Sequence, residues 1–362
     1  MLNYIESENI IQMLFGQIRK RVKLNIIKYN KKLLNKFNIK AKDFEEYKLL
    51  KELNYKYYLD INDIDIKILD LLYKDIDDNL LTNICKIRFD NLKILNLENN
   101  KINKLDSLKT IKLDKLEKLI LKFNTILDID ILQEIDLRKL RQLNLVGNKI
   151  INISVLENVN CYNLEILDLT SNMIPDITAL SNTNFKKLKE LNLSHNDISE
   201  IDILEKVKFD RLEILDLYNN YISDIKALER VKFIELKCLN LGRNMIIDLE
   251  ILANVNFPKL EILNLSNNKI MYIDLLNKVN FRDLKDLQLN HNKISDIEVF
   301  NKVKFEKIEI INLSNNFITD ISVFEEVNFS NLQILNLNNN ELVGNEHLKH
   351  FYLLPRNYVL YL

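Results

Sequence analysis

The feature that most constrains the fold of this chain is a repeat of 24 residues. The segment Leu-Lys-Ile-Leu-Asn-Leu-Glu-Asn-Asn begins at Leu92, and its pattern returns every 24 residues without an insertion. The resulting eleven units share the consensus LxxLxLxxNxIxDIxxLxxVxFxx, in which x is any residue. Self-similarity at such a period indicates a solenoid, in which each unit contacts only its neighbours. Units one to eleven begin at Leu92, Leu116, Leu140, Leu164, Leu188, Leu212, Leu236, Leu260, Leu284, Ile308 and Leu332.

The spacing of apolar residues within a unit predicts its local structure. Positions 4 and 6 alternate with other residues, as a short strand with one buried face requires. Positions 11, 14, 17 and 20 recur every three residues, which favours a tight 3₁₀ or helical return. Position 22 is phenylalanine in seven successive units, from Phe185 to Phe329, and predicts an aromatic spine on the convex side. Cys161 stands at this position in unit three and is expected to be a small core side chain.

The LxxLxLxxN segment resembles the leucine-rich repeat family, and the second half of each unit is similar to the short class typified by the phosphatase-1 regulatory subunit. The resemblance covers about three quarters of the chain. It implies an α/β fold: a right-handed horseshoe-shaped solenoid with a parallel sheet on its concave face. It also implies protein–protein recognition as the function.

Asparagine occupies position 9 of every unit. The family resemblance implies that its side chain turns inward and bonds the backbone of the turn after the strand. Asparagine also tolerates left-handed backbone, so we expect position 9 to help form turns that contain little glycine. The expected structural asparagines are Asn100, Asn124, Asn148, Asn172, Asn196, Asn220, Asn244, Asn268, Asn292, Asn316 and Asn340.

The ends of the array need cover, because a bare solenoid end is an open sheet edge. We predict a degenerate capping repeat over 67–91, the eleven repeats over 92–355, and a capping strand over 356–362. Residues 1–66 do not fit the repeat and are predicted to form a small helical domain.

The exposed strand positions suggest where a partner binds. Position 2 alternates in charge from Lys93 to Glu309, which predicts a ladder of opposite charges on neighbouring strands. Position 5 is mostly asparagine. Hydrogen bonds between stacked amides along the sheet would explain this, and so would an AT-rich coding bias. The sharper hypothesis is an apolar and acidic patch for a protein partner, because exposed apolar side chains beside an aromatic are typical of interfaces. Its residues are Ile166, Asp168, Asn192, Ile214, Asp216, Tyr218 and Ile262.

The N-terminal segment leaves three readings open. Ten basic residues and no acid lie between Arg19 and Lys42, along a helical apolar period. This stretch suits an anionic surface or a nucleic acid, but the net charge of −1 for the whole chain favours a solvated face of a helical domain. The segment around residues 10–30 is faintly similar to an F-box, although the Leu-Pro opening and tryptophan are absent. The alternative function is therefore an F-box-type substrate receptor, whose residues 1–66 bind a ubiquitin-ligase adaptor.

Composition argues against several other functions. The four glycines lie far apart, which excludes the glycine-rich phosphate loops of nucleotide-binding proteins. Three widely spaced cysteines indicate reduced thiols, and His195 and His291 are four units apart, too far to share a metal. No run of 18 apolar residues occurs, and the N-terminal acids argue against a signal peptide. We therefore expect a non-catalytic scaffold without cofactor or metal, in the cytoplasm or the nucleus.

Overall fold

The repeat folds into one continuous parallel sheet. The computed structural model describes residues 48–55, 66–327, 329–342 and 359–362. Within them, thirteen three-residue strands follow one another in chain order, and each pairs in parallel with the next. The strands are β1 Ile68–Asp70, β2 Ile94–Asn96, β3 Lys118–Ile120, β4 Gln142–Asn144, β5 Ile166–Asp168, β6 Glu190–Asn192, β7 Ile214–Asp216, β8 Cys238–Asn240, β9 Ile262–Asn264, β10 Asp286–Gln288, β11 Ile310–Asn312, β12 Ile334–Asn336 and β13 Val359–Tyr361.

Each strand occupies positions 3 to 5 of its unit, and the leucines at positions 4 and 6 are buried beneath the sheet. Leu215 and Leu217 of unit six, for example, are inaccessible to solvent. In units one to ten the chain then returns through a short helix that begins at position 15 or 16, and another short helix lies between β1 and unit one. These helices are α5 Asp78–Ile84, η2 Asp106–Thr110, η3 Asp130–Glu134, η4 Ser154–Glu157, η5 Thr178–Asn182, η6 Asp202–Glu205, η7 Lys226–Glu229, η8 Glu250–Ala253, η9 Asp274–Asn277, η10 Glu298–Asn301 and α6 Val323–Glu326, where η marks a 3₁₀ helix.

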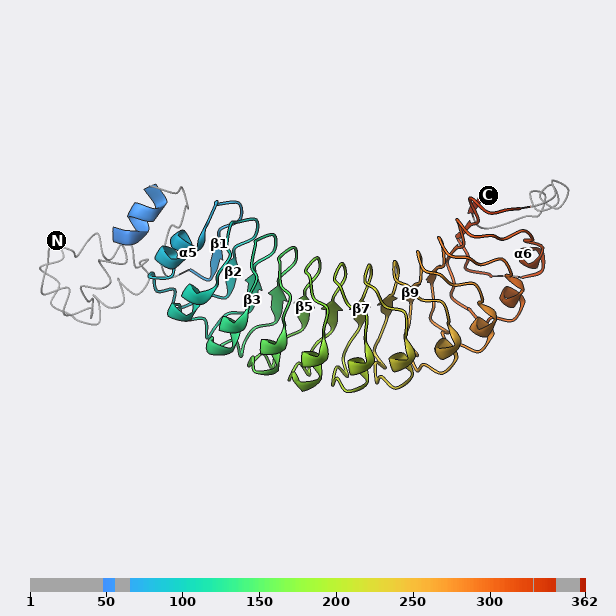
Figure 1. Cartoon of the computed structure of the whole chain (residues 1–362), viewed down its shortest axis with the longest axis horizontal. Helices are drawn as coiled ribbons and strands as arrows, with labels where there is room; N and C mark the ends of the chain where they lie inside the picture. The colour runs from blue at the N-terminus through green and yellow to red at the C-terminus, as the bar shows by residue number, and fades with distance from the viewer. Residues whose placement is uncertain (1–47, 56–65, 328, 343–358) are drawn as a thin grey trace, which may run out of the picture.

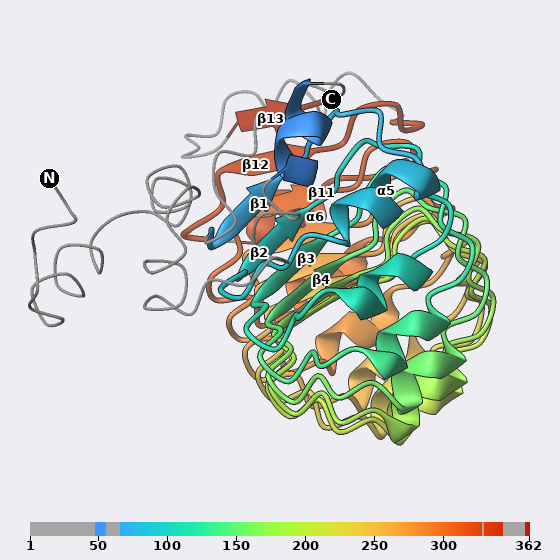
Figure 2. The same cartoon turned by 90° about the vertical axis from the view of Figure 1, so that its left-hand side faces the viewer.

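The units stack into an arc. Figure 1 shows the strands along its inner side and the short helices along its outer side. Seen along the array in Figure 2, the sheet and the row of helices form two layers around one core. The solenoid with a parallel concave sheet that the repeat predicts is therefore confirmed.

Both ends of the sheet carry additional chain. At the first end, β1 pairs with β2, and Ile84, Ile87 and Phe89 are buried in the core. A helix at 48–55 adds Leu50 and Leu53 to the same core. At the other end, β13 pairs with β12. The division into domains stays a prediction, and most of the helical domain expected at 1–66, including the basic stretch and the F-box-like segment, lies outside the described residues.

Beneath the outer layer, the position-22 side chains are buried, from Phe185 to Phe305, and Cys161 takes their place in unit three. On the surface, the predicted charge ladder at position 2 forms. Glu165 lies between Arg141 at 3.3 Å and Lys189 at 2.9 Å, and Lys237 contacts Glu213 at 2.7 Å. These pairs are at least partly exposed, so each contributes little to stability.

The left-handed residue of each turn is at position 8, so the expectation that position 9 takes this conformation is wrong. Position 8 has φ between 53° and 64° in all eleven units, whether it is Asn219, Arg243 or Phe123. A main-chain ladder holds these residues there: the amide of position 8 donates to the carbonyl of position 7 in the next unit, as from Asn219 to Gly242 at 2.9 Å. Such bonds offset the roughly 1–2 kcal/mol that left-handed backbone costs a residue with a Cβ.

Candidate functional site

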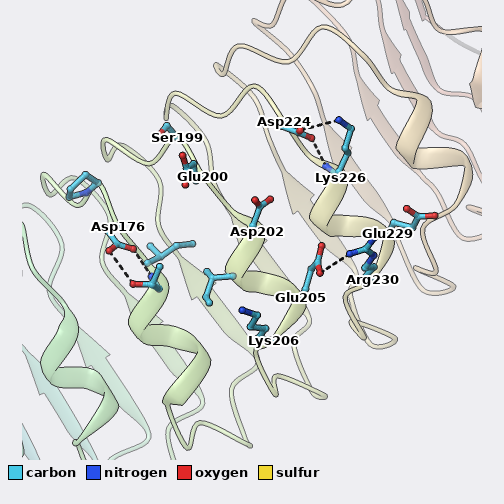
Figure 3. A pocket seen from close by; sticks show the side chains of 14 residues that line it. Asp176, Ser199, Glu200, Asp202, Glu205, Lys206, Asp224, Lys226, Glu229 and Arg230 are labelled. Atoms are coloured by element: carbon cyan, nitrogen blue, oxygen red, sulfur yellow. Dashed lines mark hydrogen bonds and ion pairs between the residues drawn. The ribbon is translucent and has the colours of Figure 1, made fainter.

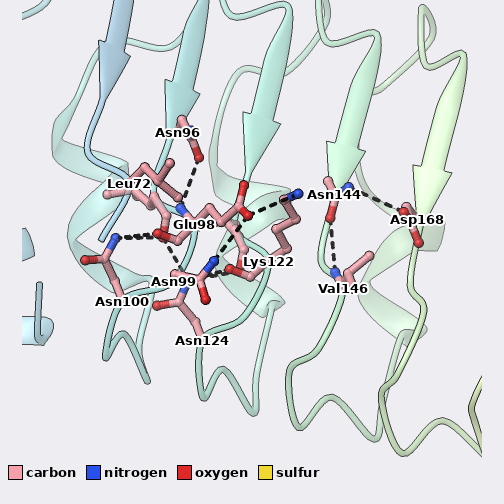
Figure 4. Close-up of polar contacts among 12 residues, drawn as sticks. Leu72, Asn96, Glu98, Asn99, Asn100, Lys122, Asn124, Asn144, Val146 and Asp168 are labelled. Carbon is pink, nitrogen blue, oxygen red and sulfur yellow. Dashed lines mark hydrogen bonds and ion pairs between the residues drawn. The ribbon is translucent and has the colours of Figure 1, made fainter. Parts of the chain in front are cut away.

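The asparagines at position 9 lie inside the solenoid and join each unit to the previous one. The Asn220 amide donates to the carbonyls of Leu217 at 3.1 Å and Leu193 at 3.0 Å, and its Oδ1 accepts the amide of Ile198 at 3.0 Å. The same bonds recur in the neighbouring units, and Figure 4 shows Asn100 and Asn124 in equivalent places. The ladder is structural, because its polar atoms face buried backbone and not solvent.

Position 5 has a local role that the sequence analysis missed. Its side-chain oxygen accepts the amide of position 7 in its own unit, as from Val146 to Asn144 at 3.2 Å and from Tyr218 to Asp216 at 2.9 Å. Bonds along the sheet are fewer; one joins Asn144 to Asp168 at 3.4 Å. Because the recurring bond needs only an acceptor, asparagine and aspartate serve equally, and a continuous amide ladder is not what the column forms.

Six of the seven predicted patch residues lie in two columns of the concave sheet, and the seventh, Tyr218, follows β7. Strand pairing places Asn192 between Asp168 and Asp216, and Glu190 between Ile166 and Ile214. Ile262 is two strands beyond Ile214, with Cys238 between them. The isoleucines therefore do not form a continuous apolar line. Glu190, which the sequence analysis left out of the site, interrupts it.

Three carboxylates gather on β5, β6 and β7: Asp168, Glu190 and Asp216. Burial raises the pKa of Glu190, and the charges of Asp168 and Asp216 raise it further. Burial also raises the pKa of Asp216, and Asp168 adds to this effect, while the Tyr218 amide, the Asn240 side chain and His195 oppose it. The carboxylates thus disfavour one another's charge, and a cation placed among them would relieve that repulsion.

Tyr218 lies next to these carboxylates and is held on both sides. Its ring centroid is 5.4 Å from that of His195 in the preceding unit. On the other side is Gly242, where an added Cβ would be 2.9 Å from Tyr218 Cδ2. A glycine at position 7 therefore leaves room for the ring, and this glycine was the sequence signal for the packing. Ser194, at position 7 of unit five, is buried, and its hydroxyl donates to Asn192 at 2.8 Å.

A hollow lies away from the concave face, on the loops before the outer helices. It has a volume of about 640 Å³ and lies between the loops of units four to six. Figure 3 shows Asp176, Glu200 and Asp224 on three successive loops, and an ion pair of 3.3 Å between Glu205 and Arg230. The charges of this hollow are mixed in sign and partly paired within the chain.

Thiols and metal-ligating side chains are the other candidates for chemistry in the described residues. No group of three or more metal-ligating side chains occurs among them. Burial raises the pKa of Cys85 and Cys238 to about 11 and that of Cys161 to about 12, so these thiols are protonated at neutral pH. Across the described helices, none has the length and apolar character needed to span a membrane.

Comparisons with known proteins agree with this architecture. A family profile described as leucine-rich repeats (2 copies) matches residues 186–230, 258–302 and 282–326. The comparison with curated protein sequences finds no match. Among solved structures, an internalin from Listeria monocytogenes is 29% identical over 89% of this chain and 88% of its own, with a TM-score of 0.71.

Two more distant structures share the fold. A leucine-rich repeat protein from Leptospira interrogans is 21% identical over 86% of this chain and 98% of its own, with a TM-score of 0.50. A chain in the octameric complex of Latrophilin 3, Unc5D and the leucine-rich repeats of FLRT2 is 21% identical over 75% of this chain and 83% of its own, with a TM-score of 0.59. Together with the 24-residue period and the parallel sheet, these matches identify the chain as a leucine-rich repeat protein.

Proposed function

We propose that this protein is a non-catalytic recognition scaffold that binds a basic segment of a protein partner on the concave face of units four to six. Leucine-rich repeat proteins generally mediate protein–protein interactions. The observation that carries the specific proposal is the group of Asp168, Glu190 and Asp216 on three adjacent strands.

The chemistry of the group favours a cationic ligand. Neighbouring strands are about 4.8 Å apart, so the two aspartates are separated by roughly 10 Å along one column. Burial is the main cause of the raised pKa of Glu190 and of Asp216, and neighbouring carboxylates add to it. A lysine or arginine side chain would offset both effects by stabilising the charged carboxylates. Tyr218 supplies an amphipathic ring of the kind that interface hot spots favour. Ile214, which is exposed on the same strand as Asp216, adds apolar contact.

The test is affinity capture from the protein's own cells with the full chain as bait. Asp168→Asn with Asp216→Asn removes two charges and keeps the acceptor that position 5 needs, so the fold is preserved. Capture of the partner should be lost with this variant, and equally with Tyr218→Ala combined with Asp216→Asn.

The matched control changes the convex side. Lys208→Ala with Lys232→Ala alters two exposed residues at position 21 and should leave capture unchanged. If capture survives the concave variants and is lost with the convex one, the binding site is on the outer side and the proposal is wrong.

The F-box-type receptor remains the second hypothesis, and its evidence lies in residues outside the described structure. The same experiment with a chain lacking residues 1–66 separates the two. Recovery of a cullin-type adaptor by the full chain alone would support the receptor, whereas partners retained by both chains would support the scaffold.

A further inference from the structure

A row of exposed apolar side chains follows the loops that leave the strands, on one edge of the arc and away from the concave patch. It is densest in units seven and eight, where Met245, Ile247, Met271 and Tyr272 are 38%, 56%, 44% and 71% exposed. We name these four residues the edge patch. Main-chain bonds keep the loops in register, because the amide of position 10 donates to the carbonyl of position 11 in the unit before, as from Lys269 to Ile246 at 2.9 Å. The edge patch is therefore a fixed surface feature.

Tyr272 interrupts a rule of the repeat. Position 13 is aspartate or asparagine in seven units, where its side-chain oxygen accepts the amide two residues later, as from Glu250 to Asp248 at 2.7 Å and from Glu298 to Asp296 at 2.9 Å. Lys104 and Glu200 replace it by charged residues, but Tyr272 replaces it by an exposed aromatic ring. Unit eight therefore lacks the stabilising hydrogen bond of position 13 and has an exposed ring instead. Such a departure from the stabilising residue of a repeat is expected where a side chain serves an interaction.

Charges of opposite sign flank the edge patch. On the concave side, positions 8 and 10 of units seven to nine carry a basic row, which consists of Arg243, Lys269 and Lys293. On the convex side, positions 13 and 15 carry an acidic row, which consists of Asp248, Glu250, Asp274, Asp296 and Glu298. All of these side chains are exposed. In units four to six the signs do not separate in this way, because position 10 contains Asp197 and position 15 contains Lys226.

This arrangement fits a second copy of the same surface. A two-fold axis running along the array in the plane of the contact exchanges the concave and convex sides. It therefore places the basic row of one copy against the acidic row of the other, with the apolar residues face to face. Closed homodimers use such self-complementary patches. A two-fold axis in the same plane but perpendicular to the array would place rows of like charge opposite each other.

We propose that the edge patch and its two charged rows form a homodimer interface, with the two-fold axis parallel to the array. This goes beyond the proposed function and does not depend on it, because the concave sheets of the two copies open toward opposite sides and both stay accessible. The patch spans about three units and is smaller than a standard interface, so the dimer is weak and depends on concentration.

The test is sedimentation equilibrium of the full chain between about 1 µM and about 500 µM, a range that covers weak association. The wild type should convert from monomer to dimer within it. Met271→Ser with Tyr272→Asp should remain monomeric. This variant gives unit eight the Ser-Asp pair that stands at Ser223-Asp224 and Ser295-Asp296, so it restores the loop bond and should fold at least as well. Met173→Ser, at an exposed position of unit four, is the control and should dimerise like the wild type.

A charge exchange tests the orientation. Lys269→Glu with Lys293→Glu makes both rows predominantly acidic, and Glu250→Lys with Asp274→Lys and Glu298→Lys makes both rows predominantly basic. Each variant alone should be monomeric, and an equimolar mixture should recover the dimer. A wild type that stays monomeric throughout the range would overturn the proposal and leave the patch to another partner. A dimer that survives Met271→Ser with Tyr272→Asp, or a mixture that fails to associate, would also overturn it.

Discussion

The stability of the array should depend on the inward asparagines, and Asn220→Ala in unit six tests this directly. Asn220 lies 6% exposed, between the backbones of units five and six. The carbonyls to which the Asn220 side chain donates keep other donors when it is removed. The Leu193 carbonyl also accepts from Asn196, the Leu217 carbonyl from Asn244, and the Tyr218 carbonyl from the His195 amide. The Ile198 amide donates to Asn220 Oδ1 and becomes unsatisfied in the variant. An unsatisfied buried donor costs about 1–3 kcal/mol, which is the expected loss in the free energy of unfolding.

Urea denaturation followed by circular dichroism measures this loss, and an unchanged slope would allow it to be taken from the midpoint. Lys208→Ala, on the exposed convex side, is the control and should be nearly neutral. Asn220→Asp keeps the acceptor for Ile198 but turns a carboxylate oxygen toward the carbonyls of Leu193 and Leu217. It should therefore be more destabilising at neutral pH than Asn220→Ala. A loss for Asn220→Ala no larger than that of Lys208→Ala would refute the reasoning.

Three further outcomes are expected. Burial raises the pKa of Asp216, so between the ordinary aspartate pKa and the raised one the folded state binds more protons than the unfolded state. The free energy of unfolding therefore falls as the pH rises through this range. Asp216→Asn removes this cost and should raise the urea midpoint at pH 7 but not at pH 3. Gly147→Ala should lower the free energy of unfolding by about 1 kcal/mol or more, measured by thermal melts. The reason is that Gly147 has φ +64° and that a Cβ there would be 2.5 Å from Phe123 Cδ1. An unchanged melt would contradict the packing of the Phe123 ring. Despite the basic stretch from Arg19 to Lys42, the chain should not bind duplex DNA or RNA strongly at physiological salt, and tight binding that collapses between low and moderate salt would contradict this.

The structure also changes the expected effect of Asp216→Ala. By its sequence position, Asp216 is an exposed strand residue at which alanine would have little effect. In the fold it accepts the Tyr218 amide at 2.9 Å, so alanine removes a turn bond as well as a charge. Asparagine is the appropriate replacement, because position 5 of most other units shows that it preserves the turn.

The sequence by itself determined the solenoid. With a fixed period of 24 and leucine at positions 4 and 6, any fold that buries these side chains must repeat one strand and one return per unit. The same regularity identified the column of asparagines from Asn100 to Asn340 and the alternating charges from Lys93 to Glu309, because residues one period apart become neighbours in space. The inward direction of the asparagine side chains was implied by the family resemblance.

Only the tertiary structure decided how individual side chains are used. It assigned the left-handed turn to position 8, because a main-chain ladder between units can hold even Phe123 in that conformation. It brought Asp168, Glu190 and Asp216 together on three adjacent strands, although the two aspartates are two periods apart in sequence. The pairing of Tyr218 with Gly242 likewise depends on the space between two units. The repeat fixes which positions are adjacent. Packing between two neighbouring units sets the backbone conformation, the burial and the ionisation of the residues at those positions.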